Sequence, residues 1–148
     1  MMMHTDVSSR PEEAPMKSAA TILQAVARIT GPILIVLGIA FWTGHWYQLL
    51  PLHIGLGSLL ALALLAQAIV AARAGVNGGF VALAILWVPL MLVFGMTQAN
   101  LFPGQYHWVI RVLHLAVGIT AMGMIDGLGK QVHARGRAGD LHAVGAQT

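Results

Sequence analysis

Residues 28–73 read RITGPILIVLGIAFWTGHWYQLLPLHIGLGSLLALALLAQAIVAAR. Only the two ends of this stretch, Arg28 and Arg73, are charged, so 44 consecutive residues contain no Asp, Glu, Lys or Arg. A single helix of that length would be about twice the roughly 20 residues that cross the apolar core of a bilayer. Gly, Pro and aromatic residues gather in the middle of the stretch, at 43–51, and predict a turn there. The stretch therefore predicts two antiparallel membrane-spanning helices.

A second uncharged run, of 37 residues, separates Arg73 from Arg111. Each connection is too short to cross a bilayer, so neighbouring helices should be antiparallel. We therefore expect an all-α fold, an integral membrane four-helix up-down bundle over residues 20–128. The predicted spans are residues 22–42, 52–72, 80–96 and 106–128. The polar segments 1–19 and 129–148 are expected to be mobile tails.

The composition supports this class and excludes several others. The 148-residue chain has 8 basic and 5 acidic residues, and this 9% charged content is far below the roughly 25% of an average soluble domain. It has no cysteine, which excludes disulfides, iron–sulfur clusters and a cysteine nucleophile. No nucleophile elbow, Walker loop, HExxH motif or carboxylate pair is present, so any redox or catalytic role would depend on a bound cofactor.

The basic residues predict the orientation. Seven of them fall on one side of the predicted bundle, and the turns on the other side contain none: Arg10, Lys17, Arg28, Arg73, Lys130, Arg135 and Arg137. The positive-inside rule then places both termini in the cytoplasm of a multi-pass protein of a bacterial-type inner membrane. The opposite side carries aromatic residues typical of a membrane interface: Trp42, Trp46, Tyr47, Phe102, Tyr106 and Trp108. The chain start lacks the apolar region of a cleaved signal, and we expect no nucleic-acid partner, because basic and aromatic residues are not interleaved.

A short repeat occurs in the second and fourth spans. Residues 52–57 read LHIGLG and residues 113–118 read LHLAVG. The repeat suggests two fused helix hairpins of the same design, related by an axis along the membrane normal. His53 and His114 then occupy equivalent positions on helices that can face each other, toward the non-cytoplasmic side.

The histidine pair suggests a haem site. Gly57 and Gly118 follow the two histidines by four residues, on the same helical face, where they would leave room for a flat ring. Arg111 lies three residues before His114 and is the one charge well inside the outer half of the bundle. Such a charge indicates function by default, and a haem propionate would be a suitable counter-ion. We expect His53 and His114 to be axial ligands of one haem b, anchored by Arg111.

Two alternatives remain open. His45 and His107 lie on the same side, and four imidazoles could bind copper or zinc, although His107 and His114 are about 10 Å apart along their helix. In the other alternative the histidines and glycines only pack helices together, and Arg111 extends to the headgroups. We expect Gln67, deep in the second span, to make an interhelical hydrogen bond.

At His53, His114 and Arg111, within four spans, the chain resembles small membrane b-type cytochromes, the cytochrome b561-like proteins. The resemblance covers the architecture of residues 20–128 and the paired LHxxxG motif. It implies an electron carrier or redox subunit, rather than a stand-alone enzyme. Many proteins of that group look like two-haem proteins, whereas the cytoplasmic half of this bundle has no histidine.

The expected function is therefore one-electron transfer with a quinol or an outer-face redox partner, through one bis-histidine haem near the outer face. The chain would act as a homodimer or within a larger membrane complex. The alternative function is a cofactor-free membrane subunit, an assembly factor or a small-solute carrier, in which the histidines are structural or bind a non-haem metal.

Overall fold

The structure, a computed structural model, describes residues 13–145, except for the side chains of residues 13, 140 and 142–144. Four long helices and two short 3-10 turns make up the described chain, which contains no strand: α1 (Glu13–Trp42), η1 (Tyr47–Leu49), α2 (Leu50–Arg73), α3 (Gly78–Thr97), η2 (Gln98–Asn100) and α4 (His107–Gly145). The predicted all-α class is confirmed.

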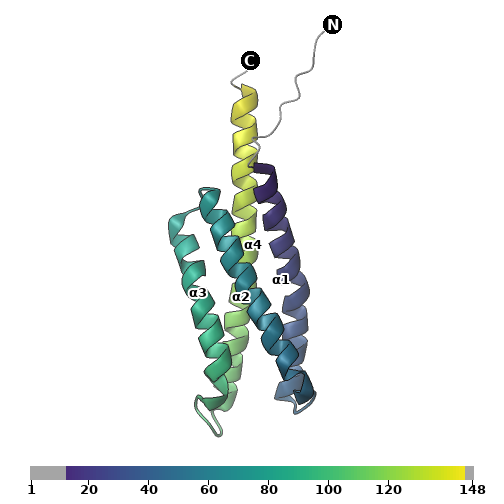
Figure 1. Cartoon of the computed structure of the whole chain (residues 1–148). Coiled ribbons are helices and arrows are strands. Elements are labelled where there is room, and N and C mark those ends of the chain that lie inside the picture. Colours follow the sequence, from purple (N-terminus) through teal and green to yellow (C-terminus); the bar gives the residue numbers. More distant parts are fainter. Residues whose placement is uncertain (1–12, 146–148) are drawn as a thin grey trace.

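The helices form two antiparallel hairpins, α1–α2 and α3–α4 (Figure 1). Helices α2 and α4 contact each other, while α1 and α3 flank them on opposite sides. The start of α1, the turn between α2 and α3 and the end of α4 lie at one end of the bundle, and the other two turns lie at the opposite end. The two helices that carry the repeat are therefore the central pair.

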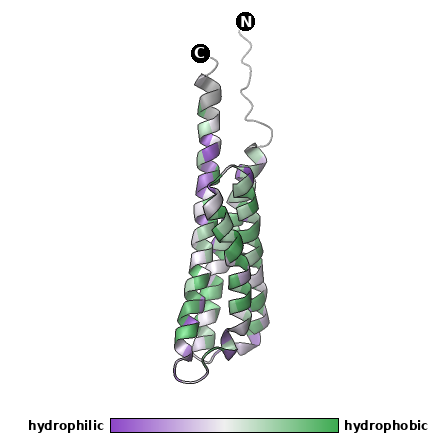
Figure 2. Ribbon diagram, turned by 90° about the vertical axis from the view of Figure 1, so that its left-hand side faces the viewer, coloured by the Kyte–Doolittle hydropathy of each residue, from purple (hydrophilic) through white to green (hydrophobic). Residues whose placement is uncertain are grey.

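All four helices are long and apolar enough to cross a membrane. Many of their large apolar side chains point away from the bundle, among them Ile29, Leu62, Leu86 and Val93. Figure 2 shows that apolar residues cover the middle of the bundle, whereas polar residues gather along the projecting part of α4 and near the turns. An outer surface of this kind would be covered by lipid, and the fold fits a multi-pass membrane protein.

Two helices are longer than predicted. Helix α1 begins at Glu13, within the segment expected to be an N-terminal tail, and α4 continues through most of 129–148 to Gly145. The extensions pack on each other, because the Lys17 side chain lies over Gly136, and just beyond the N-terminal extension Thr21 Oγ1 hydrogen-bonds His133 Nε2 at 3.1 Å. Contacts between α1 and α4 thus extend the bundle beyond the apolar residues that predict the spans.

The turn between the hairpins is tightly specified. Gly75 ends α2 in the left-handed conformation, with φ of 72°, which glycine adopts without steric strain. Asn77 then caps α3, because its side-chain oxygen accepts hydrogen bonds from the backbone N–H groups of Gly79 and Phe80 at 2.9 and 3.3 Å. Through these two residues the chain reverses its direction within the few residues that connect α2 to α3.

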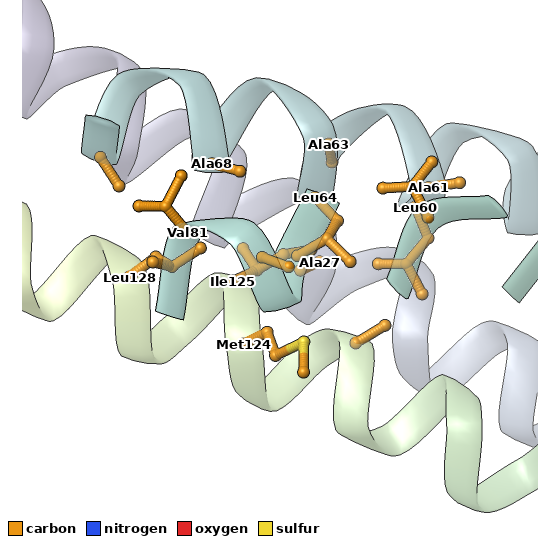
Figure 3. Packing of buried hydrophobic residues seen from close by; sticks show 14 of the residues in the cluster. Ala27, Leu60, Ala61, Ala63, Leu64, Ala68, Val81, Met124, Ile125 and Leu128 are labelled. Atoms are coloured by element: carbon orange, nitrogen blue, oxygen red, sulfur yellow. The ribbon is translucent and has the colours of Figure 1, made fainter. Parts of the chain in front are cut away.

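The core lies where α2 meets α4 (Figure 3). On α2, small and large residues alternate along the buried side, as at Ala61, Leu64 and Ala68, which are almost completely inaccessible. They pack against Ile125 and Leu128 of α4. The alanines allow the helix backbones to approach closely, as is typical of helices that pack within a membrane.

A regular contact joins α1 to α4. Met122 of α4 lies over Gly31 of α1. In the other direction, Gln24 of α1 lies over Gly129 of α4, and Lys17 of α1 lies over Gly136 of α4. The positions advance by seven residues on both helices in opposite directions, which is an antiparallel heptad spacing. We call these three glycine contacts the α1–α4 glycine seam. At each of them a Cβ on the glycine would collide with the partner side chain.

Candidate functional site

The structure brings His53 and His114 together. His53 lies in the first turn of α2, and His114 lies two turns into α4. Their imidazole centroids are 6.2 Å apart, with the ring planes inclined by 45°. Both side chains are half-buried, at the end of the bundle where the turns within the two hairpins lie.

Each histidine has the same kind of neighbours on the preceding helix. His53 meets the ring of Phe41 of α1 edge-on, with centroids 5.4 Å apart, and a Cβ added at Gly38 would lie 3.9 Å from its Cε1 atom. His114 lies against Phe94 of α3, with centroids 6.0 Å apart, and a Cβ at Gly95 would lie 3.3 Å from its Cε1. In both hairpins a glycine and a phenylalanine of the first helix thus hold the histidine of the second.

The polar atoms of the pair lack partners. Nδ1 of His53 and Nδ1 of His114 are buried, and neither makes a hydrogen bond to any described residue. The two Nε2 atoms also make no hydrogen bond within the described chain, and they are not fully buried. Because buried polar groups are nearly always paired, the two imidazoles side by side are a candidate site for a further group.

The other three residues of the predicted haem site lie close to the two histidines in sequence, but they do not contact the imidazoles in the way that Gly38 and Gly95 do. Gly57 and Gly118 are half-buried, and a Cβ at either position would meet no atom within 4 Å, so open space lies beside both. Arg111 is half-buried and forms no hydrogen bond or ion pair with the residues that the structure describes. It remains a cation without a counter-ion, one turn from His114 along α4.

The two further histidines lie apart from this pair. Nδ1 of His45 is 3.1 Å from the hydroxyl oxygen of Thr43, and Nδ1 of His107 donates to the backbone oxygen of Leu101 at 3.1 Å. Both hydrogen bonds lie within the turns that carry the histidines. Among residues 13–145, no three described His, Cys, Asp or Glu side chains come together. The arrangement of four imidazoles that would suit copper or zinc is thus not formed.

The donor set fits haem better than a bare metal ion. A protein zinc site uses three or four protein ligands, whereas a haem b could be held by two histidines. In this chain two imidazoles come together, with centroids 6.2 Å apart.

Four neighbours of the pair were not anticipated from the sequence: Gly38, Phe41, Phe94 and Gly95. A signal was available, because each hairpin has a glycine and a phenylalanine in its first helix shortly before the turn.

Gln67 differs from its expected role. It is completely buried, yet its amide nitrogen and oxygen have no hydrogen-bond partner among the described residues, so the predicted interhelical hydrogen bond is wrong.

The two glycines beside the rings give a matched prediction. The methyl group of Gly95→Ala would lie closer to His114 than nearly all real contacts of this kind, and the imidazole must shift, whereas Gly38→Ala leaves an ordinary contact with His53. We expect a clear change in the NMR resonance of the His114 Cε1 proton in Gly95→Ala. A change at most one third as large is expected for His53 in Gly38→Ala. Equal changes would contradict the packing described for the pair.

No family model matches the chain, and neither a curated protein nor a solved structure matches it.

Proposed function

We propose that the chain is a membrane haem b protein that holds one haem between His53 and His114. The observation that carries this proposal is the pair of adjacent, unpartnered imidazoles on the two central helices. The function is one-electron transfer with a quinol or an outer-face redox partner. The resemblance to cytochrome b561-like proteins supports the same assignment.

The residues around the pair have distinct roles in this proposal. His53 and His114 would hold the haem through their imidazoles, and a haem bound by two histidines would supply one-electron transfer. Arg111 pairs with a propionate, which supplies the counter-ion that the described chain does not. Phe41 and Phe94 cover the imidazoles and limit the access of water, which keeps the ligands in place.

The position of the site determines which partner it can reach. The histidines lie near the turn between α1 and α2 and the turn between α3 and α4, and no basic residue occurs in those turns. If the positive-inside rule holds, this end faces away from the cytoplasm, with both termini cytoplasmic in a bacterial-type inner membrane. One centre near this face exchanges electrons there and leaves most of the bilayer uncrossed. A homodimer or a larger membrane complex would bring the partner to this face.

An absorption measurement tests the proposal. The full chain is expressed with added haem precursor, purified in mild detergent, and measured in the oxidised and dithionite-reduced states. We expect a reduced-minus-oxidised spectrum of six-coordinate haem b and about one haem per chain. A colourless protein that is folded by circular dichroism would contradict the proposal, and would favour a cofactor-free membrane subunit, assembly factor or small-solute carrier.

A further inference from the structure

The two nitrogens of each paired imidazole differ in their surroundings. Nδ1 of His53 and Nδ1 of His114 are buried beyond the reach of water, and neither has a hydrogen-bond partner among the described residues. Neither Nε2 atom is fully buried, so Nε2 is the nitrogen that each ring can offer to a ligand. A neutral imidazole that binds a metal through one nitrogen carries its proton on the other. Each Nδ1 would then be a buried N–H group that donates to nothing in the described chain.

Gly95 faces the edge of His114 that carries Nδ1. A Cβ at Gly95 would lie 3.3 Å from Cε1 of His114 and 4.0 Å from its Nδ1. A hydroxyl one bond further out would therefore come within hydrogen-bond distance of Nδ1. At the equivalent Gly38 of α1, a Cβ would have only Cε1 of His53 within 4 Å, at 3.9 Å. The approach to Nδ1 is thus closer in the second hairpin.

A hydrogen bond at the second nitrogen normally strengthens a histidine ligand. Metal-binding histidines almost always donate that N–H group to a carbonyl, a carboxylate or water, which makes the imidazole more basic. A more basic imidazole favours the oxidised form of a haem, which carries one more positive charge than the reduced form, and second-shell hydrogen bonding is one of the ways in which a protein tunes a haem. Without such a bond, His53 and His114 favour the oxidised form less.

The distribution of carboxylates acts in the same direction. No Asp or Glu occurs between Glu13 and Asp126 in the sequence. Asp126 follows His114 by 12 residues, about 18 Å along α4, and its carboxylate pairs with Arg28 at 3.0 Å. No side-chain carboxylate of the described chain therefore lies at the histidine pair to offset an added positive charge there. The surroundings of the pair favour the state with the lower positive charge.

We infer that Gly95 sets the reduction potential of the site by withholding a hydrogen bond from Nδ1 of His114. This role rests on the proposed function, because Gly95 acts through a haem ligand and is a positioning residue. The missing bond favours the reduced state. The site therefore accepts an electron readily from its donor, and it passes that electron on only to a stronger oxidant.

Gly95→Ser and Gly95→Ala separate the hydrogen bond from the added volume. Both place the same Cβ against Cε1 of His114, but only serine adds a hydroxyl. Its oxygen can accept from Nδ1 while its hydrogen is donated four residues back along the helix, as the Thr97 hydroxyl donates to the backbone oxygen of Val93 at 2.7 Å. We expect the one-electron reduction equilibrium of Gly95→Ser to fall about fivefold relative to Gly95→Ala, or about 40 mV in midpoint potential. Redox titration of the haem-loaded chain in detergent, followed by absorption, measures this difference.

A control pair and a second measurement complete the test. Gly38→Ser and Gly38→Ala should differ by less than half as much, because Nδ1 of His53 lies more than 4 Å from that Cβ position. In the haem-free chain, the ¹⁵N resonance of Nδ1 of His114 should move in Gly95→Ser relative to Gly95→Ala. An unmoved resonance, or a moved resonance with equal midpoint potentials, would overturn the role of Gly95 and leave the haem proposal standing. A wild-type chain that binds no haem would contradict the proposed function itself, and the role of Gly95 with it.

Discussion

His53→Ala and His114→Ala are each expected to remove at least nine tenths of the six-coordinate haem b spectrum, and to lower the haem-to-protein ratio to a similar extent. Each variant leaves only one imidazole at the site, because none of the other described histidines joins the pair. A b-type haem has no covalent link to the protein, and with one of its two imidazole ligands removed it would lose the six-coordinate state and be held more weakly against extraction by detergent. The measurement is a reduced-minus-oxidised spectrum of purified protein, with haem quantified after extraction.

Matched controls are present in the same chain. His45→Ala and His107→Ala remove imidazoles that are hydrogen-bonded within their own turns, and both variants should keep the full spectrum. A monodisperse elution profile and unchanged helix content show that each variant is folded. Full retention of the spectrum in both pair variants would reject the assigned ligands. Loss in His107→Ala equal to that in His114→Ala would indicate a different ligand set.

Gly129→Ala is expected to lower the free energy of unfolding by about 1–3 kcal/mol relative to Gly123→Ala, because it leaves a buried amide unpaired. At Gly129 the new methyl group would lie 2.9 Å from Cγ of Gln24 and closer still to its amide, so the whole side chain must move. Gln24 is buried, and its amide donates to the backbone oxygen of Asp126. The substitution therefore breaks a hydrogen bond in the α1–α4 glycine seam.

Gly123→Ala serves as the control on the same helix. A Cβ at this exposed position meets no atom within 4 Å, and alanine favours a helix over glycine by up to about 1 kcal/mol. The control should be neutral or slightly stabilising. Unfolding is followed by circular dichroism as sodium dodecyl sulfate is added to mixed micelles. If Gly129→Ala is as stable as the control, the seam does not hold α1 against α4 as described.

The sequence is sufficient to predict the four helices and their order. Two long runs without charge, interrupted by turn residues, allow only helices in a bilayer, because any other backbone would leave N–H and C=O groups unpaired in lipid. It also predicts His53 and His114 as a pair, because the LHxxxG repeat places them at equivalent positions in two hairpins. The structure places these two rings side by side.

The tertiary structure alone decides which side of each helix faces a neighbour. Helices α2 and α3 are apolar on nearly all sides, so their sequences contain no polar stripe to show the outward face. The orientation of each helix about its own axis is set by the positions at which small residues allow a neighbouring helix to approach closely. For this reason the sequence shows a glycine shortly before each turn, but only the packed hairpins show that Gly95 of α3 faces His114.

The lengths of α1 and α4 are decided in the same way. The residues of α4 beyond 128 are polar and rich in glycine, and by themselves they predict a tail. In the structure, the Lys17 side chain of the N-terminal segment lies over Gly136 of this segment, so the two polar segments pack against each other as helices. Local sequence therefore determined which segments can cross a membrane, whereas contacts between distant residues determined how far the bundle extends and which side chains surround its histidine pair.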